Sequence, residues 1–503
     1  METKNSPYRI FIFLLMLSIV TSCEKDNPAQ PEEQLKLIVP VGFHTIQAAI
    51  DASSHGDTII VMPGVYFENI DFKGKNVLVQ SIVPENTDTI ALTIIDGGGN
   101  GPVVRFEGGE NEDAMLYGFT ITNGNAGTNG DGGGIKVSNG SSPTIKSNVI
   151  KMNSARYGAG LFVSNNSEPT ILMNTITENK ATGSRGAGIY VINQSHAIIK
   201  DNVFSDHEDV DAVIHIGGAN AGHKSSAEIT GNIIENNSTT FGAGGIKVAV
   251  ESWAIIAGNT ITNNRGFGDN VAGAISIVHN SVAEIKNNVI TGNSANRAGA
   301  IIIYRESEAT ITGNTISENS AGSQDGSHGI GGGIMLTYYG SAVISNNVIS
   351  NNKAWNGNHG GGGIAIYSWG QQTDAVIENN QIIGNQALRW GGGIYVTGSA
   401  TTVVIKNNVI DSNKAYPGNQ ACGGAIYLGS AAKATVVENT ISNNYAQWRG
   451  GGIYAHRQAV VKNADGAEWP RNNFSPFDEP NNTYMDNSHT DTSEGGENVY
   501  FAK

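Results

Sequence analysis

The chain is poor in charge, in cysteine and in long hydrophobic segments. Of its 503 residues 15% are charged, and Asp and Glu outnumber Lys and Arg by 45 to 30. The resulting net charge of -15 argues against nucleic acid or an anionic membrane surface as a partner, because such partners require clustered cations. A neutral glycan is easier to accommodate, and an acidic glycan requires local Arg and Lys or a bound cation. Two cysteines exclude a disulfide framework.

The one long apolar run lies close to the N-terminus and is too short to span a bilayer. Ile10–Val20 covers eleven residues and follows Lys4 and Arg9, which is typical of a secretory signal peptide. The run leads into the letters VTSC, which resemble the lipobox of bacterial lipoproteins. The resemblance implies that residues 1–22 are removed and that Cys23 carries lipid. The alternative is a plain signal peptide that happens to contain a cysteine.

A polar segment follows the predicted lipid site. Residues 23–36 are rich in charged residues and contain proline, which predicts a flexible tether. Acidic residues directly after the cysteine resemble the signal that sends some Gram-negative lipoproteins to the cell surface. The resemblance implies a lipid-anchored protein of the bacterial outer membrane that faces outward.

Glycine is abundant, with 65 residues, and it punctuates a repeat that fills the rest of the chain. A Gly-rich turn precedes an aliphatic residue every 26 to 33 residues where no unit is skipped: Ile135, Leu161, Ile189, Ile246, Ile275, Ile301, Ile334, Ile364, Ile394, Ile426 and Ile453. An asparagine marks each unit between these turns, at 148, 174, 202, 232, 259, 288, 314, 347, 380, 408 and 439. Ten of these eleven have a second asparagine five residues later.

Each unit contains three short alternating apolar runs and no helical stretch, which excludes βαβ units. The pattern predicts an all-β, single-stranded, right-handed parallel β-helix of roughly 12–14 coils, in which inward Ile and Val stack between coils about 4.8 Å apart. Asparagine tolerates turn conformations and can bond its counterpart one coil away, and glycine permits sharp turns. We therefore interpret the Asn and Gly repeats as structural.

The repeat also predicts the domain organisation. Residues 37–110 form an N-terminal cap and the first coils, residues 111–460 form regular coils, and residues 461–503 form a C-terminal cap. Ile46, with two further apolar residues three and four positions later, predicts one face of a short helix that closes the end of the core.

The repeats GGGIYV and NxIxxNxA resemble those of polymorphic outer-membrane proteins and of right-handed β-helix proteins in the pectin-lyase-like superfamily. Residues 45–81 are similar to the start of many carbohydrate-active β-helices. The resemblance implies the fold but leaves the activity open, because this superfamily includes lyases, hydrolases, epimerases, esterases and adhesins. The motifs of polygalacturonases, pectin methylesterases and pectate lyases are missing from this sequence.

One unit departs from the repeat, and such departures are where function tends to lie. Residues 205–226 lack the Gly turn and are rich in His, Asp and Glu. Strand alternation predicts that the residues after the inward isoleucines point outward in one stack across three coils: Tyr190, His215 and Lys247.

This stack suggests a catalytic site for a polysaccharide lyase. His215 and Lys247 are candidates for the base of a β-elimination on a uronic acid polymer. Glu208, Asp209 and Asp211 are candidates for binding a metal ion such as calcium, which would acidify the proton that leaves. The alternative is a solvated loop with an ordinary histidine.

A second candidate surface is aromatic. Tyr395, Tyr427 and Tyr454 follow the inward isoleucine in three successive units, so they are predicted to form an outward platform on which sugar rings stack. The adjoining turns add cations and indole rings: Arg389, Trp390, Trp448 and Arg449. The alternative is that the rings stack on one another and stabilise the sheet.

These observations predict a surface-anchored β-helix that binds or processes a neutral or acidic polysaccharide. The alternative is an adhesin or structural protein with a protein partner and no catalysis.

Overall fold

The computed structural model describes residues 36–209, 211–218, 222, 224–268, 271–322, 329–355, 359–417, 420–462, 482–489 and 499–501. The predicted signal peptide, Cys23 and all but the last residue of the predicted tether lie outside these ranges.

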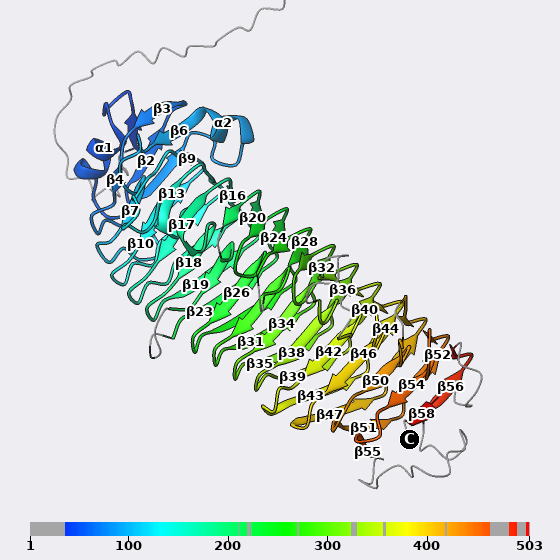
Figure 1. Ribbon diagram of the computed structural model, residues 1–503. Coiled ribbons are helices and arrows are strands. Elements are labelled where there is room, and N and C mark those ends of the chain that lie inside the picture. The colour runs from blue at the N-terminus through cyan, green and yellow to red at the C-terminus, as the bar shows by residue number, and fades with distance from the viewer. Residues whose placement is uncertain are drawn as a thin grey trace, which may run out of the picture. The chain divides into compact units, whose positions relative to one another are not determined.

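From Lys36 onward the chain winds into a parallel β-solenoid with three long sheets (Figure 1). In its described residues, sheet A has 16 strands, from β1 (Lys36–Val39) to β55 (Val460–Lys462), and sheet B has 15, from β3 (Gly64–Phe67) to β56 (Thr483–Met485). Sheet C has 15 strands: β4 (Ile70–Asp71), β7 (Val104–Phe106), β10 (Ile135–Val137), β14 (Leu161–Val163), β18 (Ile189–Val191), β22 (Ile214–Ile216), β26 (Ile246–Ala249), β30 (Ile275–Val278), β34 (Ile301–Tyr304), β38 (Ile334–Thr337), β42 (Ile364–Tyr367), β46 (Ile394–Thr397), β50 (Ile426–Leu428), β54 (Ile453–Ala455) and β58 (Val499–Phe501). The predicted right-handed parallel β-helix is confirmed.

One regular coil shows how the repeat folds. β31 (Val282–Lys286) belongs to sheet A, β32 (Val289–Thr291) to sheet B and β34 to sheet C. Between sheets B and C lies β33 (Ser294–Ala295), one of a row of ten described two-residue strands. In the regular coils the connection from this row to sheet C contains the Gly-rich turn, so the variable loops border one edge of sheet C; the connection from β21 to β22 lacks that turn.

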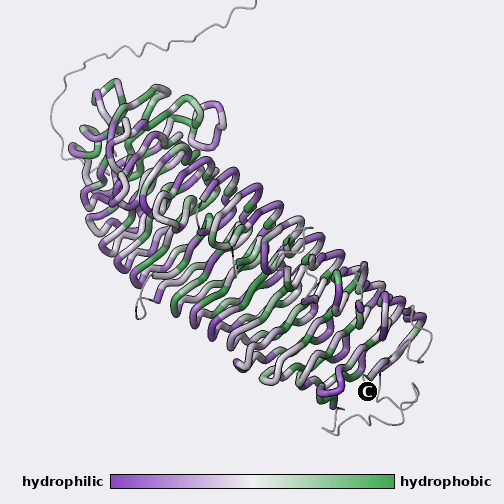
Figure 2. Tube along the Cα trace, viewed as in Figure 1, coloured by the Kyte–Doolittle hydropathy of each residue, from purple (hydrophilic) through white to green (hydrophobic). Residues whose placement is uncertain are grey.

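The core is a set of aliphatic columns inside the coils. Successive coils pair in register, so Ile246 lies beside Ile275 and Ile275 beside Ile301, and all three are fully buried. Figure 2 shows hydrophobic and hydrophilic residues alternating along the coils. Because strands alternate their side chains, each inward column requires an outward column beside it.

Two asparagine ladders run inside the turns on either side of sheet B, as predicted. The backbone N–H of Asn314 donates to Asn347 Oδ1 at 2.9 Å, and its Nδ2 donates to the Ile285 carbonyl at 2.8 Å. The second ladder repeats the pattern, with Asn319 Nδ2 donating to Asn352 Oδ1 at 3.0 Å. These amides are buried and saturate the backbone groups of the turns, which a buried turn requires.

The Gly-rich turns are needed mainly for close backbone approach between coils. A Cβ built on Gly362 would lie 2.4 Å from the carbonyl oxygen of Gly392 in the next coil. Gly361, one residue earlier, has φ +84°, a left-handed conformation that favours glycine. The predicted structural role of these glycines therefore has two causes, tight turns and stacked backbones.

A short helix closes the N-terminal end, with the predicted face buried. α1 (Ile46–Ala52) buries Ile46, Ala49 and Ile50, and the side chain of Thr45 accepts from the Ala48 N–H at its start. A second helix, α2 (Thr87–Leu92), was not expected from the sequence and buries Ile90. Neither helix of the described residues is long and apolar enough to cross a membrane.

Candidate functional site

The predicted stack on sheet C exists in the structure. Tyr190 on β18 pairs with His215 on β22, and His215 pairs with Lys247 on β26. The Tyr190 ring meets the His215 ring edge-on, with centroids 5.1 Å apart. All three side chains lie on the outer side of sheet C, because the isoleucines that precede them fill the core.

The expectation that this stack is open to solvent is wrong. Tyr190 is 0% exposed and His215 is 2% exposed. β17 (Lys180–Arg185), the strand before β18, helps to cover this stack, since Arg185 donates from Nη1 to the Tyr190 hydroxyl at 3.2 Å. A base must reach its substrate proton, and His215 is buried away from any such contact.

Asp211 joins the two proposed bases. Its carboxylate accepts from Lys247 Nζ at 2.7 and 2.9 Å and lies 3.1 Å from His215 Nδ1. Although burial alone would raise the pKa of Asp211, His215 and Lys247 hold it well below its usual range. Burial lowers the pKa of His215 to about 4, against the opposing effect of Asp211. The site is therefore a Lys–Asp ion pair against a neutral histidine.

The three proposed metal ligands do not converge in the part of the chain that can be described. Glu208 is exposed, the side chain of Asp209 lies outside the described residues, and Asp211 is committed to Lys247 and His215. Among the described residues no group of three His, Cys, Asp or Glu side chains is arranged to hold a metal ion.

The same coil also interrupts the second asparagine ladder. His207 occupies the ladder position between Asn179 and Asn237, is fully buried, and its Nδ1 lies 3.1 Å from Asn237 Oδ1. Its Nε2 has no hydrogen-bond partner among the described residues. Burial lowers the pKa of His207 to about 4. The missing second asparagine was visible in the sequence, but its replacement by a buried histidine required the structure.

The predicted tyrosine platform is a buried column. Tyr395, Tyr427 and Tyr454 pair in register on β46, β50 and β54, but they are only 2%, 7% and 7% exposed. Their rings stack on one another, with centroids 5.5 and 5.2 Å apart, and Trp390 stacks on the Tyr427 ring at 5.3 Å. The prediction of exposed rings is wrong, because the strand spacing matches the ring spacing and the Gly-rich connections fold over the column.

The cations predicted beside this column lie against the indole rings. The guanidinium of Arg389 sits 4.5 Å from the Trp390 ring centroid, and that of Arg449 sits 4.3 Å from the Trp448 ring centroid. All four side chains are partly exposed. They form two cation–π pairs on the edge of sheet C, two coils apart.

A second aromatic group on sheet C was missed in the sequence. Tyr367, the last residue of β42, contacts the rings of His359 and Trp369 at 4.8 and 5.4 Å, and Trp369 is 59% exposed. Tyr338 follows β38 and meets the Tyr304 ring at 5.1 Å. Tyr304 and Tyr367 are the last residues of their strands. They do not directly follow the inward isoleucine, so the pattern at that position does not predict them.

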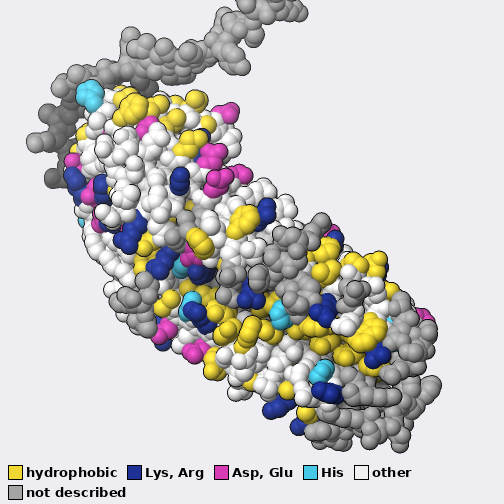
Figure 3. All heavy atoms as spheres, viewed as in Figure 1, with side chains coloured by type: hydrophobic (Ala, Val, Ile, Leu, Met, Phe, Trp, Pro, Cys, Tyr) yellow, Lys and Arg dark blue, Asp and Glu magenta, His cyan; other side chains and the backbone are white. Residues whose placement is uncertain are grey.

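Charge is distributed unevenly between the edges of the solenoid. From Arg265 to Gly452, the described residues of the two-residue strands and of the connections from them into sheet C include six cations and no carboxylate: Arg265, Arg297, Lys353, Arg389, Lys414 and Arg449. Asp269 and Asp325, in the same connections, lie outside the described residues. We call the outer side of sheet C and these connections the C face. Figure 3 shows Lys and Arg among hydrophobic side chains along the viewed coils.

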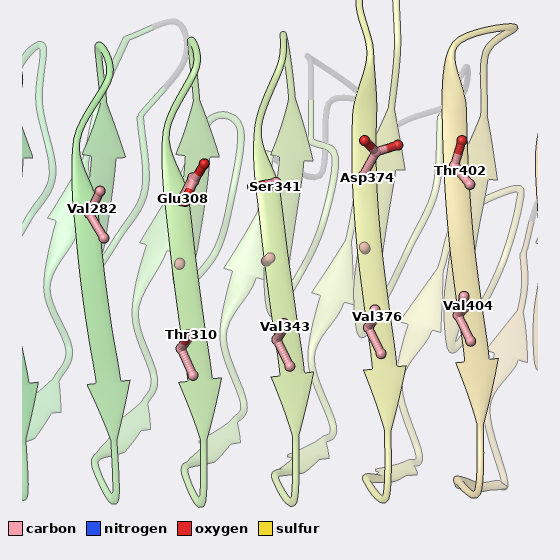
Figure 4. Close-up of a pocket in the computed structure, with 12 residues that line it drawn as sticks. Val282, Glu308, Thr310, Ser341, Val343, Asp374, Val376, Thr402 and Val404 are labelled. Carbon is pink, nitrogen blue, oxygen red and sulfur yellow. The ribbon is translucent and has the colours of Figure 1, made fainter.

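A different hollow lies on the outer side of sheet A (Figure 4). It has a volume of about 410 Å³ and crosses five coils, with valines such as Val343 beside the carboxylates Glu308 and Asp374. It has no cation and no aromatic ring among its lining residues. The C face is therefore the richer candidate for recognising a ligand.

Comparison with known proteins supports the fold. The model of the right-handed β-helix region matches residues 89–208, 173–281 and 267–441. No curated protein matches the chain significantly.

Two kinds of solved structure align at low identity. The periplasmic alginate epimerase AlgG aligns with a TM-score of 0.43 and 14% identity over 73% of this chain and 77% of that chain. PfbA, a surface adhesin of Streptococcus pneumoniae, aligns with a TM-score of 0.29 and 13% identity over 90% and 92%. Neither alignment carries an argument about function.

Proposed function

The chain belongs to the right-handed β-helix family, and on that premise we propose that it binds a polysaccharide along the C face. One observation carries the proposal. The C face combines partly exposed aromatic rings with cations over many coils, and extended polymers require an extended surface.

The two kinds of side chain suit the two parts of a sugar. An indole or phenol ring offers an apolar face to the C–H groups of a pyranose, and Trp369 and Tyr367 offer such faces. The fork of an arginine donates several N–H groups to hydroxyls or carboxylates, and Arg389 and Arg449 supply such forks at the edge.

Binding is better supported than elimination. His215 is buried, and Lys247 donates two hydrogen bonds to Asp211. A polysaccharide lyase that used this pair would have to open the coil before His215 met a substrate. A surface adhesin with a protein partner is the second candidate function, because aromatic and Arg side chains are also enriched at protein interfaces.

A glycan panel tests the proposal. The purified mature chain is titrated with neutral and acidic polysaccharides, and absorbance of unsaturated uronates is followed with and without calcium. We expect binding without formation of unsaturated products. Trp369→Ala should weaken binding several-fold, because it removes an exposed stacking surface. The matched control is Trp253→Ala, which removes an exposed indole (43% exposed) from sheet A.

Two results would contradict the proposal. Equal losses in Trp369→Ala and Trp253→Ala would move the site away from the C face. Binding of a protein partner with no glycan bound by the wild-type chain would favour the adhesin.

We further propose that lipid on Cys23 anchors the protein at the outer membrane of a bacterium, facing outward. The support is the apolar run that ends at a lipobox-like VTSC, followed by acidic residues. An anchored solenoid would present the C face to polymers outside the cell.

A further inference from the structure

Beside Lys247, the C face carries a hollow with a polar floor and a cationic rim. It has a volume of about 200 Å³, below the roughly 300–1,000 Å³ of pockets for drug-sized ligands. Ser276 lies at its base, and Lys247, His279 and Arg305 border it. Phe241, 67% exposed, forms part of the wall. A space of this size suits one substituent or one residue of a longer polymer. We call it the Lys247 hollow.

The floor holds a hydroxyl group that lacks a partner. Ser276 pairs with Lys247 across β26 and β30, so both side chains point to the outer side of sheet C. Ser276 is 2% exposed, and its Oγ has no hydrogen-bond partner among the described residues. A buried hydroxyl without a partner is costly, which indicates that a ligand oxygen completes its hydrogen bonding.

The side chains at the rim carry a net positive charge once the ion pair of Lys247 with Asp211 is taken into account. Arg305 donates from Nη1 to His279 Nε2 at 2.7 Å, which requires that nitrogen to be unprotonated. Burial, together with the positive charges of Arg305 and Lys247, lowers the pKa of His279. Lys247 is balanced by Asp211, so Arg305 supplies the one positive charge left over among these side chains.

We propose that the Lys247 hollow is a subsite for one singly charged oxyanion of the bound glycan, a uronate carboxylate or a sulfate half-ester. The inference rests on the glycan binding proposed above and adds the class of sugar. The anion would accept hydrogen bonds from the free donors of Arg305 and from Ser276 Oγ. Charge-assisted bonds of this kind are stronger than those between neutral groups.

Three polymers and two variants test the subsite by calorimetric titration of the mature chain. The polymers are a polyuronate, the same polymer with its carboxylates reduced to alcohols, and a sulfated glycan. We expect the wild-type chain to bind an anionic polymer about tenfold more tightly than the reduced one, and Arg305→Gln to remove that difference. The tighter of the two anionic polymers identifies the group.

Ser276→Ala separates ligand binding from folding. Because the hydroxyl makes no bond within the described chain, its removal should leave the melting temperature unchanged or higher, while affinity for the anionic polymer falls. The control for loss of charge is Lys151→Gln on the outer side of sheet B, which should bind like the wild type.

The failures are distinguishable. If the wild-type chain binds the reduced polymer as tightly as the polyuronate and the sulfated glycan, the anionic subsite is wrong and glycan binding stands. If Arg305→Gln and Ser276→Ala bind the anionic polymers like the wild type, the subsite lies elsewhere. If the wild-type chain binds none of the three polymers, both proposals fail.

Discussion

A single residue type performs separate tasks in neighbouring positions of each turn. Asn287 adopts a left-handed conformation with φ 56°, whereas Asn288, next in the chain, donates its backbone N–H to Asn314 Oδ1 at 2.9 Å. The first position needs tolerance of positive φ, and the second needs an amide that donates and accepts. Serine, methionine, aspartate, glycine or glutamate replaces the first asparagine in other coils. Among the described residues, the two regular ladders depart from asparagine only at His207.

Replacing a ladder amide should therefore destabilise the whole solenoid. Asn314→Leu removes the acceptor of the Asn288 N–H and the donor to the Ile285 carbonyl, both buried. We expect a loss of at least about 1–3 kcal/mol in the free energy of unfolding. Urea denaturation followed by circular dichroism measures it.

The matched control is a leucine on the surface. Gln381→Leu places the same side chain at an exposed position of β44 (Gln381–Ile383) on sheet B, where it breaks no ladder bond. Its free energy of unfolding should stay within about 0.5 kcal/mol of the wild-type value. Equal midpoints for the two variants would refute the buried ladder.

Removing Lys247 should harm the fold rather than only a surface reaction. Asp211 is 6% exposed, and Lys247 neutralises it. Lys247→Ala leaves that carboxylate with a neutral histidine alone, so we expect a loss of roughly 1.5–3 kcal/mol in stability. Thermal unfolding of Lys247→Ala and of the double variant Lys247→Ala with Asp211→Asn tests this.

The double variant should recover part of the loss, because it no longer buries an unpaired charge. If Lys247→Ala were as stable as the wild type, the ion pair would be unimportant to the fold.

At the scale of the element, one coil differs from all regular ones. The coil of β20 (Val203–Ser205), β21 (Glu208–Asp209) and β22 replaces a ladder asparagine with His207 and places His215 under the adjoining connection. Both imidazoles are buried and neutral at pH 7, since their pKa values are lowered to about 4. This coil is therefore the part of the described solenoid most sensitive to acid.

Stability should fall as the pH falls from about 6.5 to 4. In this window the unfolded chain binds protons at His207 and His215, whose ordinary pKa is 6.5, while the folded chain does not. Each histidine then contributes stability that is complete above pH 6.5 and is lost by up to about 1.4 kcal/mol per pH unit. Urea titrations at several pH values, with hydrogen exchange of β22, measure this loss.

His207→Asn restores the ladder and supplies the control. It should be more stable than the wild type at pH 5 and should show a smaller dependence on pH. A pH profile identical to that of the wild type would mean that His207 does not cause the acid sensitivity.

In the molecule as a whole, the C face has a cationic edge although the net charge of the chain is -15. The short strands and the connections into sheet C hold arginines and lysines without carboxylates among their described residues after Arg265, whereas sheet A mixes carboxylates such as Glu308 and Asp374 with lysines such as Lys286. If the C face binds an acidic glycan, raising the salt concentration should weaken binding, because exposed charges are screened. The net charge does not reveal these cations, because it sums all charged residues of the chain.

The cellular location of the protein is a further property of the whole molecule, and removal of Cys23 tests it. Cys23→Ser removes the proposed acylation site, so the protein should move from the membrane fraction to the soluble or secreted fraction. Fractionation of cells and labelling with a fatty acid analogue measure this. Continued lipid labelling of Cys23→Ser would show that the lipoprotein interpretation is wrong.

The repeat in the sequence is enough to predict the fold, the register of the coils and the asparagine ladders. A recurring inward aliphatic residue determines which residues stack even though the loops vary in length, because every coil must present that residue at the same place. For that reason the sequence predicts the correct columns for Tyr190, His215 and Lys247, and likewise for the three tyrosines from Tyr395 onward.

Which outward residues are exposed to solvent depends on tertiary contacts that the repeat does not predict. Alternation gives the side of a sheet on which a residue lies, but the variable connections between the short strands and sheet C decide what covers it. Trp390 comes from such a connection and stacks on the tyrosine column, and Arg185, the last residue of β17, contacts Tyr190. The Lys247 hollow depends in the same way on side chains from three coils, whose approach no repeat period encodes.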